Sequence, residues 1–155
     1  MELGEVFKIT KEDFVVIGKE GTGPVEETDW VAELWSDFQE KFAEIENVTT
    51  ASNYWGLMSD ASSWLAPWQD QGKYLAGVEC DLDVEAPAGW TKWVMPKMEY
   101  LTFQTDSANM DFMLQKMFNE VLPQQNLQVI AAIQEHYLTE FNSDQVELYL
   151  PVKLL

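Results

Sequence analysis

The sequence predicts an α+β fold built from a β-α-β-β module that occurs twice within a single domain, residues 1–155. Two similar hydrophobic strands support the duplication, one at residues 74–80 and one at residues 146–152, and each carries a glutamate. We expect the two halves, about residues 1–86 and 94–155, to form one curved antiparallel sheet with pseudo-two-fold symmetry. Two helices would cover one face of this sheet, and a ligand cleft would lie on the other.

The first half begins with an extended segment at residues 7–17, in which a bulge is expected near residues 11–13. A helix then begins at Thr28 or Asp29 and ends at Asn47. Its apolar positions recur every three to four residues: Trp30, Val31, Leu34, Trp35, Phe38, Phe42 and Ile45. This stripe predicts that the helix packs against the sheet.

A hairpin is predicted next, with strands at residues 54–58 and 74–82. The connection between them, residues 59–72, carries two tryptophans and is long for a turn. Loops of this length are often functional. Residues 83–93 contain proline and glycine and are expected to connect the two halves.

The second half repeats the order of elements. Residues 97–104 are expected to form a strand, and Ser107 or Asn109 begins a helix that Pro123 stops. The apolar side of this helix holds Met110, Met113, Leu114, Met117, Phe118 and Val121. The apolar stretch that follows is compatible with a helix or a strand, and its place in the repeat favours a strand at residues 131–137.

Composition excludes several classes of protein. No apolar run reaches the length of about 18 residues that a membrane helix needs, and the N-terminus lacks a signal-peptide pattern. The single Cys80 has no disulfide partner and no metal-ligand companion, and no nucleotide-binding or nucleophile motif is present. We therefore expect a cytoplasmic protein without membrane association, metal or cofactor.

Charge narrows the choice of ligand. The chain has 27 acidic residues, nine lysines and no arginine, so its net charge is −18. Nucleic-acid binding relies on arginine and basic patches, so it is not expected, whereas cations are attracted. Many of the acidic residues would simply keep a tryptophan-rich protein soluble. That explanation accounts less well for glutamates inside apolar strands.

Alternation along two strands places the candidate binding residues. In residues 146–152 the aliphatic side chains share one face, which fits the helix-covered core, whereas Glu147 and Tyr149 share the other. Glu147 would then face the cleft or, on an edge strand, water. If the preceding strand is present, Glu135 and Tyr137 likewise share a face. A carboxylate among aromatic rings suits a lipophilic cation, to which each ring face adds about 0.5–2 kcal/mol.

The tryptophans divide into two groups. Trp30 and Trp35 belong to the first helical stripe and are expected in the core. The other group lies on connections and either lines the cleft or packs down over the core: Trp64, Trp68, Trp90 and Trp93. His136 is out of phase with its neighbours Glu135 and Tyr137, and is expected to be structural.

The pattern of residues resembles a known family. The matching features are the Tyr-Leu-Ala-Gly-Val-Glu strand from Tyr74, Met95-Pro96 before Tyr100, the Glu135-x-Tyr137 pair, and the ending Val-Glu-Leu-Tyr-Leu-Pro-Val-Lys. Together they resemble the GyrI-like small-molecule-binding domain, the effector-binding module of AraC-type and MerR-type bacterial regulators. The resemblance covers nearly the whole chain, and its most specific part is the C-terminal end.

The resemblance implies a duplicated β-α-β-β architecture and a cleft that binds amphipathic, often cationic, drugs. The glutamate of that cleft would be Glu147 or Glu135. The implied ligand-binding residues are Glu147, Tyr149, Glu135, Tyr137, Tyr100, Trp64, Trp68 and Trp93. One departure is Met98, where the family tends to have glycine. No helix-turn-helix precedes the first strand, so we expect a stand-alone module that sequesters or senses its ligand.

Two other functions are compatible with the sequence. Some GyrI-like proteins hydrolyse cyclopropane electrophiles, and here Glu135, Tyr137 and Glu147 would activate the attacking water. Others resemble gyrase inhibitors, so the third possibility is a protein-interaction module whose negative charge imitates nucleic acid. A homodimer is compatible with either function.

Overall fold

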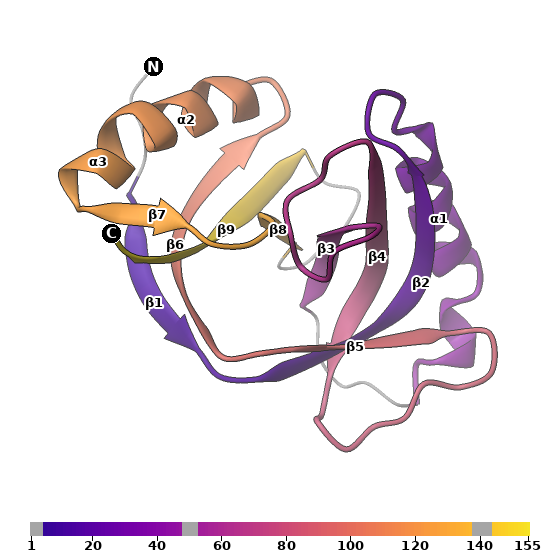
Figure 1. Ribbon diagram of the computed structural model, residues 1–155. Coiled ribbons are helices and arrows are strands. Elements are labelled where there is room, and N and C mark those ends of the chain that lie inside the picture. Colours follow the sequence, from indigo (N-terminus) through magenta and orange to yellow (C-terminus); the bar gives the residue numbers. More distant parts are fainter. Residues whose placement is uncertain (1–4, 48–52, 138–143) are drawn as a thin grey trace.

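The computed structural model describes residues 5–47, 53–137 and 144–155. In this part of the chain nine strands form one sheet, ordered β1-β6-β9-β8-β3-β4-β2-β5, with β7 paired to β9 outside that order (Figure 1). The strands are Phe7–Lys11 (β1), Phe14–Pro24 (β2), Tyr54–Asp60 (β3), Gln71–Cys80 (β4), Thr91–Met95 (β5), Met98–Asp106 (β6), Leu127–Val129 (β7), Gln134–Tyr137 (β8) and Gln145–Leu154 (β9). All their pairings are antiparallel.

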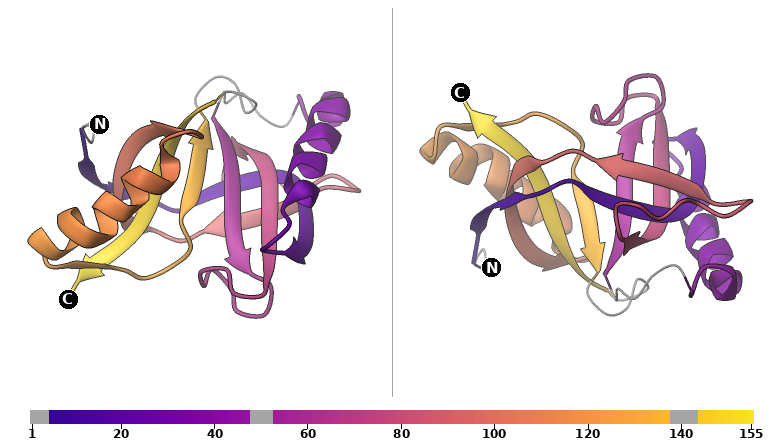
Figure 2. Two further views of the ribbon diagram at one scale, coloured as in Figure 1. Left: turned by 90° about the horizontal axis from the view of Figure 1, so that it is seen from above. Right: turned by 90° about the horizontal axis from the view of Figure 1, so that it is seen from below.

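Two helical segments cover one face of the sheet. The helical elements are Asp29–Glu40 (α1), a 3-10 turn at Phe42–Glu44, Met110–Lys116 (α2), a π-helical turn at Met117–Val121, and Leu122–Gln124 (α3). Helix α1 packs over β2 and β4, and α2 packs over β6 and β9, with β8 and β3 between the helices (Figure 2). The predicted α+β class, a curved antiparallel sheet with two helices on one face, is confirmed. The duplication itself stays a prediction.

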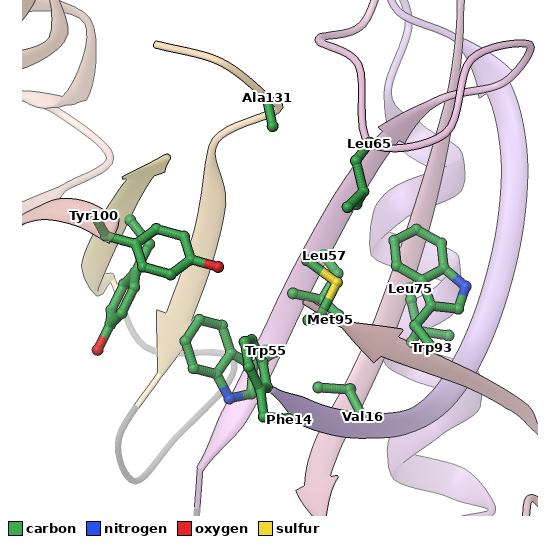
Figure 3. Close-up of a cluster of buried hydrophobic side chains, with 11 residues drawn as sticks. Phe14, Val16, Trp55, Leu57, Leu65, Leu75, Trp93, Met95, Tyr100 and Ala131 are labelled. Atoms are coloured by element: carbon green, nitrogen blue, oxygen red, sulfur yellow. The ribbon is translucent and has the colours of Figure 1, made fainter. Parts of the chain in front are cut away.

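The opposite face of the sheet curls around a core. Because β1 leads directly into β2 and β5 leads into β6, these long ribbons cross the concave side of the sheet (Figures 1 and 2). Figure 3 shows the side chains that fill this side, among them Phe14, Trp55, Tyr100 and Trp93, each no more than 5% exposed. Leu65, from the β3–β4 loop, closes the cluster from above. The face on which the sequence predicted an open cleft is therefore packed with aromatic and aliphatic side chains.

Several predicted boundaries are wrong. The expected connection at residues 83–93 already contains the start of β5, whose pairing with β2 was hidden by the nearby proline and glycine. The strand expected at residues 131–137 is shorter, since only Gln134–Tyr137 forms a strand, which pairs with β9 and β3, and β7 precedes it. The first helix ends at Glu40 and continues only as a 3-10 turn toward Asn47.

Replacing Trp55 by alanine is expected to lower the free energy of unfolding by about 3–5 kcal/mol, as for other large aromatic residues in cores. Trp55 is 1% exposed, and its ring packs 4.9 Å from those of Phe14 and Tyr149. Thermal and urea unfolding followed by circular dichroism measure the loss. The matched control is Trp64→Ala, since Trp64 is 54% exposed and its removal should change stability by about 0.5 kcal/mol or less. Equal stability of the two variants would contradict a packed concave face.

Candidate functional site

A hollow of about 400 Å³ lies on the helix-covered face, between α1 and the centre of the sheet. Its wall consists of Thr28 at the N-cap of α1, Val31, Ala32 and Trp35 from α1, Met58 from β3, Trp68 from the β3–β4 loop, Tyr74 from β4, and Glu135 and Tyr137 from β8. Among the described residues of this wall, Glu135 is the only aspartate, glutamate, lysine or histidine. The hollow is thus an aromatic and aliphatic site with a single carboxylate.

Hydrogen bonds hold the Glu135 carboxylate in place. The hydroxyl of Tyr74 donates to Glu135 Oε1 at 2.6 Å, and the hydroxyl of Tyr137 donates to the same oxygen at 3.3 Å. Trp35 Nε1 donates in turn to the Tyr74 hydroxyl at 3.0 Å. Gly56, opposite Glu135 in the β3–β8 register, makes room for this arrangement, because a Cβ there would overlap the Tyr74 hydroxyl. Glu135 Oε2 receives no hydrogen bond from the described residues.

The surroundings of Glu135 disfavour its charged form. Burial raises the pKa of the Glu135 carboxyl, and the two tyrosine hydroxyls offset this only in part. Burial also raises the pKa of Tyr74 and of Tyr137, so both phenols keep their protons and act as donors. Across residues 5–47, 53–137 and 144–155, no lysine forms an ion pair with Glu135. The described residues therefore supply hydrogen bonds to this carboxylate but no counter-charge.

Aromatic rings stand around the carboxylate. The ring of Trp35 meets those of Tyr74 and Tyr137 edge to face, with centroids 6.4 and 5.8 Å apart. Trp68 packs 5.6 Å from Trp30 and lines the hollow on the side of the β3–β4 loop. Ring faces attract cations, so this wall suits a positively charged ligand with apolar substituents.

Glu147 has a different environment, on the opposite face of the sheet. Its Oε1 lies 2.8 Å from His136 Nδ1, and His136 Nε2 lies 3.1 Å from Asn53 Oδ1. The His136 ring stacks on Trp55 at a centroid distance of 4.3 Å. The hydrogen bond from His136 is the main cause that lowers the pKa of Glu147. Glu147 is thus an ionised carboxylate with a partner in the protein.

The structure does not bring the two candidate glutamates together. In the β8–β9 register His136 pairs with Glu147, whereas Glu135 pairs with Leu148, which packs under α2. Successive side chains of a strand point to opposite faces, so Glu135 and Glu147 cannot reach one ligand atom. The hydrolytic assignment, in which both glutamates and Tyr137 act on the same water, has no support in this arrangement.

The remaining predicted residues lie away from the hollow, except for Trp68. Tyr149 and Tyr100 are 8% and 1% exposed within the concave core, where burial raises the pKa of Tyr100 to about 12. Trp93 is buried and donates to Glu20 Oε1 at 2.7 Å. Trp64 packs on the Trp93 ring at 4.8 Å and is otherwise exposed. Three of the predicted residues, Glu135, Tyr137 and Trp68, therefore line the hollow.

Sequence reasoning missed six of the nine residues that line the hollow, among them Tyr74, Trp35 and Met58. Tyr74 lies two and four residues before Ala76 and Val78 in β4, so it shares their face under α1. This alternation is a signal that could have placed it on the helix-covered face. Trp35 was assigned to the core, and it does pack there, but one edge of it also lines the hollow. Met58 gave no signal, because its role depends on the neighbouring loop.

The described residues contain no group of three or more histidine, cysteine, aspartate or glutamate side chains placed to hold a metal ion. Within the same part of the chain, no helix is long and apolar enough to cross a membrane.

Glu147→Gln is expected to lower the free energy of unfolding at neutral pH by about 1 kcal/mol, because a neutral amide accepts a weaker hydrogen bond from His136. The folded-state pKa of Glu147 lies below its unfolded value, so its contribution is full above an ordinary glutamate pKa of about 4.3. The contribution is lost as the pH falls through the lowered value. Urea unfolding over a pH series should therefore show the gap between parent and variant shrinking in acid. A gap that is constant with pH would contradict the pairing.

Solved structures share this fold. SAV2435 bound to tetraphenylphosphonium matches with a TM-score of 0.68 and 13% identity, over 96% of this chain and 94% of that one. An integron cassette protein from the mobile metagenome of Vibrio cholerae matches at 0.67 and 16% identity, over 97% of both chains. The C-terminal domain of EcmrR matches at 0.66 and 11% identity, over 97% and 98%.

A family comparison covers most of the chain. The model of Cass2, the integron-associated effector binding protein, matches residues 9–152. No curated protein matches the sequence significantly. The resemblance to GyrI-like effector-binding domains is confirmed by the family match together with the fold. The chain therefore belongs to the Cass2 family of integron-associated effector binding proteins.

Proposed function

We propose that this protein binds small lipophilic cations in the hollow beside α1, with Glu135 as the counter-ion, and that it sequesters or senses them without chemical change. One observation carries the proposal: a carboxylate stands in an aromatic hollow, and none of the lysines that the structure describes forms an ion pair with it. Glu147, the other candidate, already has His136 as its partner. The membership of the chain in an effector-binding family supports the same conclusion.

The physical chemistry of the hollow favours a weakly hydrated cation. Burying a carboxylate without a counter-charge costs free energy, and a bound cation would offset that cost. At an effective dielectric constant of about 20, opposite charges about 4 Å apart attract with roughly 4 kcal/mol. The rings of Trp35, Trp68 and Tyr137 would contact apolar substituents of the cation. SAV2435, which shares the fold, has been solved with the lipophilic cation tetraphenylphosphonium, and this supports the same class of ligand.

Glu135→Gln is expected to weaken the binding of tetraphenylphosphonium at least tenfold, about 1.4 kcal/mol or more, because the charge is lost while an acceptor for Tyr74 and Tyr137 is kept. Isothermal titration calorimetry measures both proteins directly. The uncharged analogue triphenylphosphine oxide should not distinguish parent from variant.

Two further variants locate the effect. Glu99 is an exposed glutamate of β6, and Glu99→Gln removes the same charge without touching the hollow, so its affinity should equal that of the parent. Glu147→Gln separates the two candidate glutamates. A loss of affinity in Glu147→Gln with none in Glu135→Gln would overturn the proposed site.

Tyr74→Phe is expected to move the pH midpoint of cation binding upward. The hydrogen bond from Tyr74 lowers the pKa of Glu135 against the effect of burial, so its removal raises that pKa further. Only the ionised carboxylate attracts the cation, and binding is therefore lost at a higher pH as the solution is acidified. Tyr137→Phe is the matched control, because its longer hydrogen bond of 3.3 Å should produce a smaller shift. Affinities measured across a pH series test this order, and an unchanged midpoint in Tyr74→Phe would contradict it.

A further inference from the structure

A second hollow, of about 430 Å³, adjoins the one that contains Glu135. The described residues that form its wall are all apolar: Met58, Pro67, Trp68, Phe118, Val129, Ala131, Ala132 and Ile133. Met58 and Trp68 line both hollows, so these two side chains form the partition between them. We refer to the two spaces as the Glu135 hollow and the apolar hollow.

Hydrogen bonds hold the partition in place. Trp68 Nε1 donates to the carbonyl oxygen of Lys73 at 3.1 Å, and the indole lies over Gly72, where a Cβ would overlap the ring. Met58 sits on β3, and its backbone N–H and carbonyl oxygen are both hydrogen-bonded to the side chain of Gln134. Trp68 is therefore fixed at the boundary, while the unbranched Met58 side chain can adapt its shape to a ligand.

The far wall of the apolar hollow is supplied by the second helical segment. Met117 and Leu122 are both buried under this segment although they are five residues apart, which is the spacing of the π-helical turn Met117–Val121. Phe118 lies within this turn, 46% exposed, and faces the apolar hollow rather than the core. Turns of this kind inside helices are frequent at functional sites.

We propose that the apolar hollow is a tail subsite of the same binding site, into which a ligand with a single positive head at Glu135 extends an apolar tail past Met58 and Trp68. This inference rests on the proposed function and specifies its ligand class. Of the residues that the structure describes, Glu135 is the one carboxylate that lines either hollow, so a second positive charge at the end of the tail would be buried without a counter-charge from them. The combined site thus favours one charge and one extended apolar arm.

The test is a calorimetric titration of the parent protein with alkyltriphenylphosphonium ions, from methyl to octyl, below their micelle concentrations. Each methylene that enters the apolar hollow should strengthen binding two- to fourfold, up to the value for complete burial. An analogue of the octyl compound that carries a trimethylammonium group at the end of its tail should lose this gain.

Two variants assign the gain to the apolar hollow. Val129→Trp fills it, and should abolish the dependence of affinity on tail length while leaving the methyl compound unaffected. The matched control is Val94→Trp, since Val94 is 52% exposed on β5 and lines neither hollow. Phe118→Ala removes a half-exposed ring that forms part of the wall of the apolar hollow and leaves the core intact. It should reduce the gain in affinity per methylene, and it provides a test should Val129→Trp fail to fold.

The outcomes separate the two proposals. If the methyl compound binds the parent through Glu135 but longer tails add nothing, or add equally in Val129→Trp and Phe118→Ala, the tail site is overturned and the proposed function stands. If no member of the series binds the parent, the proposed function fails and this inference fails with it.

Discussion

The hydrogen-bonded chain from Trp35 through Tyr74 to Glu135 is the interaction on which the site depends. It joins α1, β4 and β8, so that three elements distant in sequence fix one carboxylate. Hydrogen bonds in such a chain polarise one another in an apolar environment, and the donors hold the carboxylate without neutralising it. The remaining cost of the buried charge is what a cationic ligand can offset. A lysine in place of Tyr74 or Tyr137 would hold the same glutamate firmly, but its charge would already neutralise the carboxylate and remove the attraction for a cationic ligand.

The two glutamates show how far sequence alone could locate the site. Alternation within each strand was sufficient to pair Glu135 with Tyr137 and Glu147 with Tyr149. Whether the two pairs face the same side depends on the register between β8 and β9, in which His136 and not Glu135 lies opposite Glu147. No local pattern contains that register. The partners of each carboxylate are equally non-local, since Tyr74 is 61 residues from Glu135.

The fold was more predictable than the site, because its main elements have local signals. The helical stripe of α1 and the alternation in β4 and β9 follow from the periodicity of their own residues. The concave core could not be foreseen in this way. It arises because the ribbons β1–β2 and β5–β6 cross the open side of the sheet, and β5 itself follows a segment whose proline and glycine suggested a connection. Because that side is filled, the hollow in which we propose the ligand site lies on the helix-covered face.

Net charge and the hollow have separate roles in choosing a ligand. A net charge of −18 attracts every cation, and salt screens that attraction over about 8 Å at physiological ionic strength. It cannot distinguish an inorganic ion from an organic one. The Glu135 hollow can, because it offers one carboxylate and a wall of rings and methyl groups. A strongly hydrated ion would have to exchange its water ligands for the two oxygens of one carboxylate. A lipophilic cation is weakly hydrated, so it loses little on binding and gains apolar contact. In the proposed site, selectivity would therefore come from the desolvation of the ligand and the carboxylate rather than from the charge of the surface.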